Sequence, residues 1–338
     1  MARNKAAVRR LAARSLVVLV LSATPALGEP AFDVDLTFLP IDRFRIGTDE
    51  TRFGPLEFLG GFEMQSPLRR FGQLSSMRFL SPGNEFIGVA DHGHWFFGAV
   101  ERDEAGAPVG MSRFSMQRII GDDGQPVREK HYADAEGLSV HAGIATVSFE
   151  RDHRVVEYAL EPEGMGAPIG ELDFLIPEEL LAYNAGIETV ARAPDEGHLA
   201  GARIVIAERA SDAEGNIQAA ILEGPERGRF WVVRSGNFDI TDGVFLPDGD
   251  LLLLERRFTL PRGVAMRIRR IVGDHILREV LVDGPVLYEA DMTHQIDNME
   301  SIDWWQREDG ALVIALMSDD NQSRFQRSLY LEFVLLGE

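Results

Sequence analysis

The sequence alternates short hydrophobic runs with polar turns, and one such pattern recurs five times. Each repeat starts at a polar or acidic turn, continues through two apolar runs joined by a tight turn, and ends on a carboxylate. Aligned at one polar position, the repeats recur every 52 to 60 residues. A repeat of this length that contains β-hairpins is typical of a β-propeller. The five segments are residues 74–91, 134–150, 184–208, 240–255 and 298–320, aligned on Ser76, Glu136, Glu188, Asp242 and Glu300.

The apolar runs have the composition of strands. In residues 134–150, β-branched and aromatic residues follow a turn at 141–143. In residues 240–255, a Pro-Asp-Gly turn at 247–249 precedes four consecutive leucines, which is typical of a strand buried on both faces. Only residues 177–183 predict a helical turn. Outer strands are expected at residues 154–160, 168–174, 264–272 and 328–336.

This pattern predicts an all-β fold, a single β-propeller of five or six four-stranded blades. Two further strand-like runs, residues 33–39 and 56–64, precede the first repeat. Because an open sheet edge invites pairing with other chains, propellers are commonly closed by a strand from the other end of the chain. We therefore expect residues 56–64 to pair with the C-terminal blade, so that N- and C-terminal strands close the propeller. Residues 29–338 then form one propeller domain.

Residues 1–28 have the organisation of a secretory signal peptide. Five basic residues precede an apolar run at 16–21, and a small-residue site follows at 26–28. The apolar run is too short to span a bilayer as a helix. The Arg9-Arg10 pair is a feature of the twin-arginine route, but Val8 and the Leu-Ala-Ala that follows match its consensus poorly, so both the Sec and the twin-arginine routes stay open. We expect a periplasmic or secreted protein that has no membrane insertion after cleavage of this segment.

The amino-acid composition excludes several kinds of functional site and partner. The chain has 54 acidic and 34 basic residues and no cysteine. The lack of cysteine excludes disulfides, thiolate metal sites and thiol catalysis. Without residues 1–28 there are 29 basic residues against 54 acidic ones, a net charge of −25. Such a charge repels nucleic acids and anionic membrane surfaces and is compatible with bound cations. We therefore expect no nucleic-acid partner and a small anionic or ester substrate.

The repeat also predicts where the carboxylates lie in the folded protein. In an up-and-down blade, the start of the first strand and the end of the second lie on the same face of the disc. We therefore expect a ring of acids at one mouth of the central channel, with arginines between them. The predicted metal ligands are Asp91, Glu136, Glu150, Glu188, Glu208, Asp242, Glu255, Glu300 and Asp319, and the predicted anion clamp is Arg151, Arg209 and Arg256.

Carboxylates that converge in this way raise each other's pKa unless something compensates their charge. Pairing with arginines, partial protonation or a hard divalent cation would each do so. Oxygen-only ligands favour Ca²⁺, with Mg²⁺ as the alternative. A purely structural belt of salt bridges between blades is the competing interpretation. The pair His92 and His94 is a weaker metal candidate, and Trp304-Trp305 are expected to pack in the core.

Several short segments together resemble the phytase-like propeller family, the exported bacterial proteins described as having esterase-like activity of phytase. They are FGQLSS (71–76), VADHG (89–93), DAEGLS (134–139), NAGIET (184–189), NMESI (298–302) and MSDDNQSRFQRSLYLEF (317–333). The resemblance covers about residues 56–336 and implies a propeller with an ester or phosphoester hydrolase activity that uses Ca²⁺. The sequence departs from the family pattern at His92, Thr189 and Ser301, where the family has Arg, Gly and Gly.

Three functions are compatible with these observations. The first is an exported, metal-assisted hydrolase of phosphate or other esters, in which Glu136, Glu188, Asp242 and Glu300 hold the cation and the three arginines bind the anionic group. The second is a Ca²⁺-dependent lactonase. The third is a non-enzymatic periplasmic ligand-binding or scaffold propeller, in which the ring of acids and arginines is structural.

Overall fold

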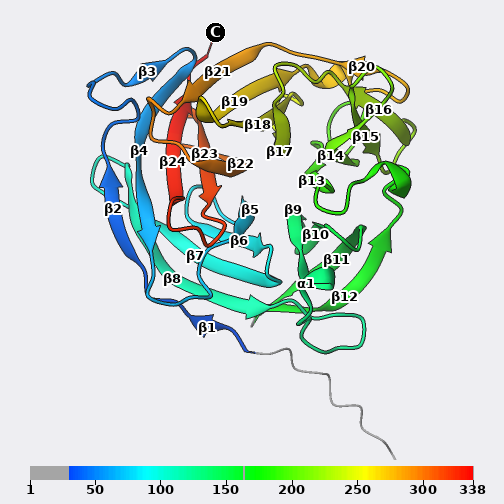
Figure 1. Cartoon of the computed structure of the whole chain (residues 1–338), viewed down its shortest axis with the longest axis horizontal. Helices are drawn as coiled ribbons and strands as arrows, with labels where there is room; N and C mark the ends of the chain where they lie inside the picture. Colours follow the sequence, from blue (N-terminus) through cyan, green and yellow to red (C-terminus); the bar gives the residue numbers. More distant parts are fainter. Residues whose placement is uncertain (1–29, 163, 338) are drawn as a thin grey trace, which may run out of the picture.

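Five sheets surround a central channel in the computed structural model, and their neighbouring strands are antiparallel except for one short parallel pair (Figure 1). The structure describes residues 30–162 and 164–337, so the predicted signal peptide lies outside the described residues. Blade 1 contains β1 (Phe32–Asp33), β5 (Leu74–Phe79), β6 (Glu85–Ala90), β7 (His94–Arg102) and β8 (Pro108–Arg118). Blade 2 contains β9 (Ala135–His141), β10 (Ile144–Phe149), β11 (Arg154–Glu161) and β12 (Gly164–Leu172).

The remaining three blades follow in chain order. Blade 3 contains β13 (Ile187–Arg192), β14 (Arg203–Ser211), β15 (Ile217–Ile221), β16 (Gly228–Val232) and β20 (Leu281–Val282). Blade 4 contains β17 (Asp239–Phe245), β18 (Leu251–Thr259), β19 (Gly263–Ile271) and β21 (Val286–Asp291). Blade 5 contains β22 (Asn298–Gln306), β23 (Leu312–Asp319), β24 (Ser328–Leu335), β4 (Leu56–Gln65) and β2 (Thr37–Ile41), with β3 (Arg52–Phe53) beside β4.

The all-β propeller expected from the sequence is therefore present, with five blades. The blades are not uniformly four-stranded, because the sheets contain four to six strands. In blade 5, β24 pairs antiparallel with β4, from Ser328 opposite Met64 to Leu335 opposite Leu56. The helical segments are short: α1 (Lys130–Ala133), η1 (Glu178–Leu180) and η2 (Gly273–His275). No helix among the described residues is long and apolar enough to cross a membrane.

Hydrophobic layers between neighbouring blades form the core. The leucine run of β18 is fully buried, as its continuous apolar sequence predicts. The largest cluster joins β13–β16 to β17 and β18, and a second joins blade 4 to blade 5. Close approach of the blades constrains the inner strands. At Gly137, for example, a Cβ would lie 2.5 Å from the backbone oxygen of Glu188 in the next blade.

The innermost strand of every blade carries a β-bulge near its start. In β13 the register shifts between Ile187 and Thr189, so that one extra residue, Glu188, stands opposite the partner strand. The shifts in the other inner strands leave Ser75, Glu136, Thr241 and Glu300 at the corresponding position. A bulge re-aims the side chain of the extra residue. In blades 1, 2, 3 and 5 the bulge directs that side chain into one mouth of the channel, whereas Thr241 of blade 4 donates from Oγ1 to the Met299 carbonyl oxygen at 3.0 Å.

This register corrects the alignment of the repeats. Ser76 and Asp242 were aligned with the three glutamates, but each lies one residue beyond the bulge. The bulge residues of blades 1 and 4 are Ser75 and Thr241. Asp242 instead corresponds to Thr189 in blade 3 and to Ser301 in blade 5. Its side chain therefore enters the channel at a different level.

Candidate metal centre at the channel mouth

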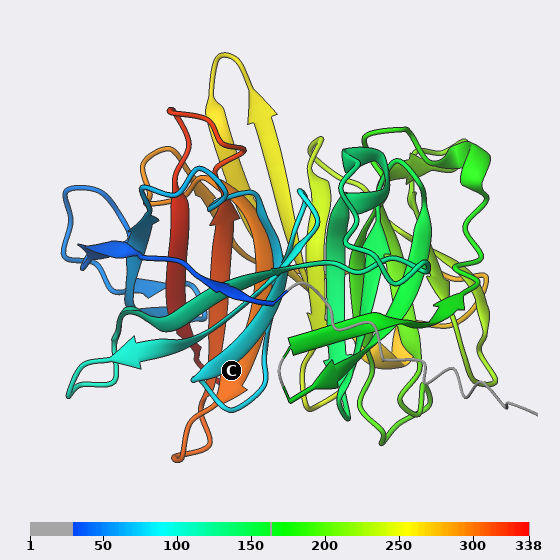
Figure 2. The same cartoon turned by 90° about the horizontal axis from the view of Figure 1, so that it is seen from below.

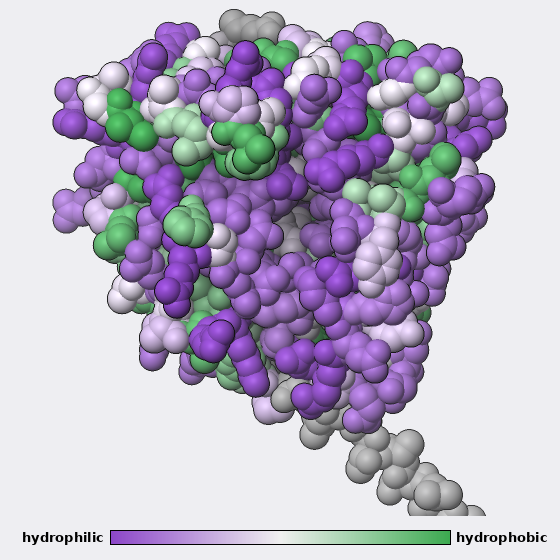
Figure 3. All heavy atoms as spheres, viewed as in Figure 1, coloured by the Kyte–Doolittle hydropathy of each residue, from purple (hydrophilic) through white to green (hydrophobic). Residues whose placement is uncertain are grey.

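Acidic and basic side chains from all five blades line a cavity at one mouth of the channel. The cavity has a volume of about 250 Å³. Figure 3 views the molecule from the same side as Figure 1 and shows a mainly hydrophilic face that is hollowed near its centre. The lining residues are Ser75, Asp91, Lys130, Asp134, Glu136, Glu150, Arg151, Asn184, Glu188, Glu208, Arg209, Arg256, Asn298, Glu300, Asp319 and Asn321.

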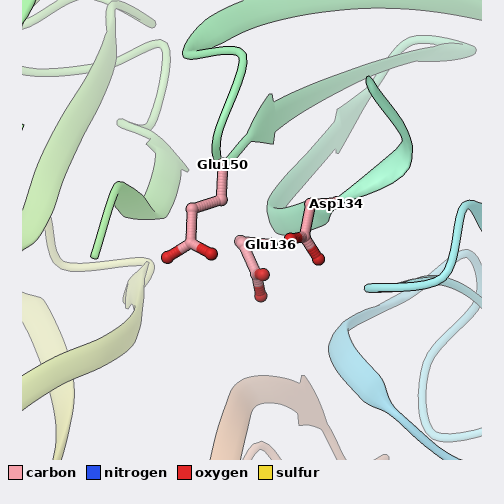
Figure 4. Close-up of side chains that lie close together, drawn as sticks. All are labelled: Asp134, Glu136 and Glu150. Carbon is pink, nitrogen blue, oxygen red and sulfur yellow. The ribbon is translucent and has the colours of Figure 1, made fainter. Parts of the chain in front are cut away.

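Three carboxylates of blade 2 form the tightest group in this cavity. Asp134 directly precedes β9, Glu136 is at the bulge of β9, and Glu150 directly follows β10. The Glu150 N–H donates to the Asp134 carbonyl oxygen at 2.7 Å, which holds the two strand ends together. One oxygen from each side chain lies within 4.8 Å of the others (Figure 4). Within the described residues, this is the one such group of potential metal ligands.

The surroundings of these acids disfavour their charged forms. Burial, and secondly the charge of Glu188, raise the pKa of Glu136 well above its ordinary value. Burial and then Asp134 raise the pKa of Glu150 to about 7. The pKa of Glu188 is also well above the ordinary range, because of burial and the nearby charge of Glu208. A divalent cation would offset this accumulated cost, because it stabilises the ionised carboxylates.

Arg256 neutralises the opposite half of the cavity. Its guanidinium donates to Asn298 Oδ1 at 2.5 Å and lies 3.4 Å from Glu208 and 3.5 Å from Glu300. Even so, burial raises the pKa of Glu300 to about 7. Arg209 contacts Glu208 at 3.1 Å and Asp239 at 2.8 Å. The mouth is therefore divided into an acid-rich half on blade 2 and an arginine-centred half on blades 3 to 5.

Two cationic side chains stand at the rim of the acid-rich half. Lys130 Nζ lies 2.9 Å from both Asp91 and Asp134 and so bridges blades 1 and 2. The Arg151 guanidinium pairs with Asp134 and lies over the ring of Tyr183, 5.5 Å from its centroid. These contacts leave one oxygen of Asp91, Oδ1, buried without a hydrogen-bond partner in the described structure.

The structure brings most of the predicted site residues together. Seven of the nine predicted acids and all three predicted arginines line the mouth: Asp91, Glu136, Glu150, Glu188, Glu208, Glu300, Asp319, Arg151, Arg209 and Arg256. Asp319 has a pKa well above its ordinary value because of burial and the charge of Glu300.

The other two predicted ligands, Asp242 and Glu255, do not line the mouth. Asp242 lies inside the channel, fully buried, where Arg78 contacts it at 2.6 Å. This follows from its position one residue beyond the bulge. Glu255 points away from the channel and is bound by Arg267 and Arg269 of β19. Both carboxylates already have arginine partners, so we remove them from the candidate ligand set.

Some site residues were absent from the predicted set. Asp134, Asn184 and Asn298 line the mouth two or four residues before a bulge glutamate. That spacing was a usable signal, because a polar residue precedes the glutamate in each of these three repeats. Lys130 had no comparable signal. It reaches the mouth from α1, whose four residues are too few to show periodicity.

The weaker candidates lie elsewhere. His92 Nε2 contacts the Arg70 carbonyl oxygen at 2.7 Å, and burial lowers the pKa of His94 to about 3. Neither histidine belongs to the group of ligands found among the described residues. Trp304 donates from Nε1 to the Phe245 carbonyl oxygen at 2.7 Å, and Trp305 is covered by the Arg102 guanidinium at 4.4 Å.

A known family model matches most of the chain. The family model described as "Phytase-like: Esterase-like activity of phytase" matches residues 69–322. The chain belongs to this family. The matched region begins just before β5 and ends just after β23, so it contains the bulge residues of all five blades. No curated protein matches the sequence.

Several solved structures match the chain at low sequence identity. A putative oxidoreductase (glucose dehydrogenase) from Thermus thermophilus is 13% identical with a TM-score of 0.41, over 82% of this chain and 99% of that one. A putative gluconolactonase is 9% identical with a TM-score of 0.42, over 89% and 100%. An α-L-arabinofuranosidase from Podospora anserina, in complex with cellotriose, is 12% identical with a TM-score of 0.45, over 91% and 98%.

Proposed function

We propose that this phytase-like protein is a hydrolase of phosphate or other esters that uses a divalent cation, with Ca²⁺ as the first candidate and Mg²⁺ as the second. The observation that carries this proposal is the convergence of Asp134, Glu136 and Glu150 within 4.8 Å, beside three arginines. The N-terminal sequence pattern adds the proposal that it acts after export, in the periplasm or outside the cell.

The donor set fits a hard cation. Every candidate ligand is a carboxylate oxygen, which Ca²⁺ and Mg²⁺ prefer. The buried Asp91 Oδ1 has no hydrogen-bond partner in the described structure and lies beside the same cavity. Such an unsatisfied buried oxygen is costly unless an ion or a water approaches it. Asp134, Glu136 and Glu150 would hold the cation, with Asp91 beside them.

A bound divalent cation would supply Lewis-acid polarisation of the ester oxygen and a more acidic water. The side chains of the protein supply the rest. Arg256 and Arg209, on the opposite half, are positioned to bind an anionic group of the substrate and to stabilise negative charge that develops during hydrolysis. Glu300 has a pKa of about 7 and so holds a proton in a large fraction of molecules near neutral pH. It is suited to donate that proton to the leaving oxygen.

Elemental analysis and thermal shift assays test the cation first. A ligand that binds only the folded state raises its apparent stability. We expect Ca²⁺ to raise the melting temperature of chelator-treated protein, and Glu136→Gln and Glu150→Gln to abolish most of that rise. Glu104→Gln, an exposed acid on the opposite side of blade 1, is the matched control and should behave as the wild type.

Turnover is then measured on phosphate esters, carboxylic esters and lactones, each with Ca²⁺ and with chelator. Cation-dependent turnover of phosphate or carboxylic esters supports the proposal, and turnover of lactones alone selects the lactonase. A protein that carries no ion, shows no stabilisation by millimolar Ca²⁺ and turns over none of the three classes would be the scaffold propeller instead.

A further inference from the structure

Three loops have a composition that is unusual for this chain. They are residues 66–71, 257–263 and 322–327, and together they contain six arginines and no acidic residue. The whole chain has 54 acidic residues and 34 basic ones. Positive charge is therefore concentrated in these segments, which we call the arginine loops.

The arginine loops lie on the face that carries the acidic mouth. Residues 66–71 lie in the loop that joins β4 to β5, and residues 322–327 lie in the loop that joins β23 to β24, which also contains Asp320. Residues 257–263 form the end of the β18–β19 hairpin. Figure 2 shows this hairpin (yellow) and the β23–β24 loop (red) projecting from the same side of the disc. The loops of blades 1 and 5 touch each other, because Gln322 Nε2 donates to the Arg69 carbonyl oxygen at 3.3 Å.

Each arginine loop also exposes a large apolar side chain. Phe325 is 96% exposed and Leu260 is 92% exposed, the two highest values among the large hydrophobic residues of the described chain. Leu68 is exposed to a smaller extent. Exposed apolar side chains scattered singly over a surface carry little information. Here the two most exposed ones are at the tips of two loops that project in the same direction.

Four of the six arginines form no ion pair with a carboxylate of the described residues. Arg257 pairs with Glu289 and Arg327 with Asp297. The four without such a pair are Arg69, Arg70, Arg262 and Arg324. In a chain with a large excess of acids, arginines that remain without an acid partner are available for an external anion. Guanidinium groups bind phosphate through paired hydrogen bonds.

We propose that the mouth face docks peripherally on a phospholipid bilayer, with Phe325 and Leu260 inserted at the headgroup level and the four arginines on lipid phosphates. Apolar tips beside cationic groups are the combination that lets a protein lie on a membrane without spanning it. The net charge of the chain predicts repulsion from anionic membranes, but screening limits charge interactions in solution to about 8 Å at physiological ionic strength. Within this distance, the charge of the arginine loops determines whether the protein binds the lipid phosphates. In the docked protein the mouth faces the bilayer.

Vesicle sedimentation tests this docking without any substrate, so its outcome does not depend on the proposed hydrolysis. The probe is vesicles of phosphatidylethanolamine and phosphatidylglycerol, and the protein is used in the form in which it accumulates in cells. We expect the wild type to sediment with the vesicles. Replacing Phe325 and Leu260 by Ser should weaken binding by about ten-fold for each side chain. Replacing Arg69, Arg70 and Arg324 by Ser should weaken it by about five-fold for each arginine.

Two controls are matched to these variants. Arg52→Ser removes an exposed arginine at the opposite end of β4, and Ile169→Ser removes a 56% exposed side chain on β12. Both should bind vesicles as the wild type does. All variants share the same N-terminus, so residues 1–28 contribute equally to each. Melting curves of the variants should superimpose, because all the changed residues are exposed.

A fluorescent reporter gives a second, independent readout. Phe325→Trp should show a blue shift of its emission when vesicles are added, whereas Ile169→Trp should not. The proposal is overturned if the wild type does not bind vesicles, or if the loop variants and the controls lose binding equally. It is also overturned if the arginine loops retain only a soluble polyanion or an acidic protein and ignore the vesicles.

Discussion

Arg256 and Arg209 together balance the charge of one half of the mouth, and both contact Glu208. The Arg256 side chain is 24% exposed and contacts Glu208 and Glu300. We expect Arg256→Met to lower the free energy of unfolding by about 3 kcal/mol near pH 7.5, because it leaves the largely buried Glu300 without its arginine partner and Glu208 with Arg209 alone. The loss should be smaller at pH 5.5, where protons can neutralise those carboxylates. Urea unfolding at the two pH values measures both effects.

The matched control for this variant is Arg307→Met. Arg307 pairs with Asp309 at 3.0 Å, but both side chains are largely exposed. Exposed ion pairs contribute about 0–1 kcal/mol. A loss of stability in Arg256→Met that is as small as in Arg307→Met would show that the mouth acids do not depend on Arg256.

Asp303 makes the stability of the protein depend on pH. It accepts a hydrogen bond from the Phe79 N–H at 2.7 Å, and burial raises its pKa from an ordinary value of 3.8 to about 6. The folded state therefore binds this proton more tightly than the unfolded state. Its contribution to stability is complete below pH 4 and is lost as the pH rises toward 6, which amounts to about 3 kcal/mol at most.

We expect Asp303→Asn to flatten the dependence of stability on pH between about 4 and 6. The asparagine keeps an acceptor for the Phe79 N–H and cannot ionise. Chemical unfolding at a series of pH values, for wild type and variant, measures this slope. Identical slopes would mean that Asp303 is ionised in the folded protein across this range.

At the scale of the strand, the bulges decide which side chains reach the mouth. Ser75 lines the mouth, whereas the neighbouring Ser76 lies beyond the bulge and contacts Asp242 at 3.4 Å. We expect Ser75→Glu to add an acid to the ring. It should lower the melting temperature of ion-free protein and increase the stabilisation by Ca²⁺, because a further carboxylate raises both the repulsion and the affinity for a cation.

Ser76→Glu is the paired variant for this experiment. It places a second carboxylate next to the buried Asp242, so it should destabilise the protein more strongly and leave the Ca²⁺ effect unchanged. Thermal shift curves with Ca²⁺ and with chelator compare the two. If Ser76→Glu increased the Ca²⁺ effect and Ser75→Glu did not, the register of β5 derived from the bulge would be wrong.

The sequence predicted the blades well because the inner strands have strong, regular apolar patterns. It could not fix the bulges, because Ser75-Ser76 and Thr241-Asp242 are adjacent polar residues. Which of two such residues is the extra one depends on backbone pairing with the next strand. The sequence also did not predict that some sheets have more than four strands. β1 and β20 have two residues each, which is too short for an alternating pattern to appear.

At the site, the sequence predicted the acids that meet at the mouth more reliably than it predicted the arginines that pair with acids. Seven acids reach the mouth because each lies at a strand end that the fold places there. Asp242 and Glu255 have similar sequence positions but different side-chain directions. Their arginine partners, Arg78 and Arg267, come from other strands, and such pairings are not visible in a single sequence.

At the scale of the whole molecule, an ion pair across the channel separates its two mouths. The Arg78 guanidinium of blade 1 contacts both oxygens of Asp242 in blade 4, at 2.6 and 2.8 Å. It also donates to the Ile302 carbonyl oxygen of blade 5 at 3.1 Å. A second cavity of about 460 Å³ lies beyond this pair, lined by Phe79, Trp304 and others. This pair therefore stands between the two cavities, and under the proposed function we expect substrate and product to enter and leave the acidic mouth on one face.

This ion pair also links three blades, so we expect it to contribute to the stability of the ring. Arg78→Met should cost about 3–5 kcal/mol, because it leaves the Asp242 charge fully buried without a partner. Arg78→Met combined with Asp242→Asn should cost less than Arg78→Met alone, since the uncompensated charge is then absent. Urea unfolding of the two single variants and the double variant measures the coupling. The exposed pair Arg113–Glu85 serves as the control, with an expected coupling below about 1 kcal/mol.

The same Asp242 variant also tests the set of cation ligands. Because Asp242 lies outside the mouth, folded Asp242→Asn should retain the full stabilisation by Ca²⁺. Loss of that stabilisation would return Asp242 to the set of cation ligands.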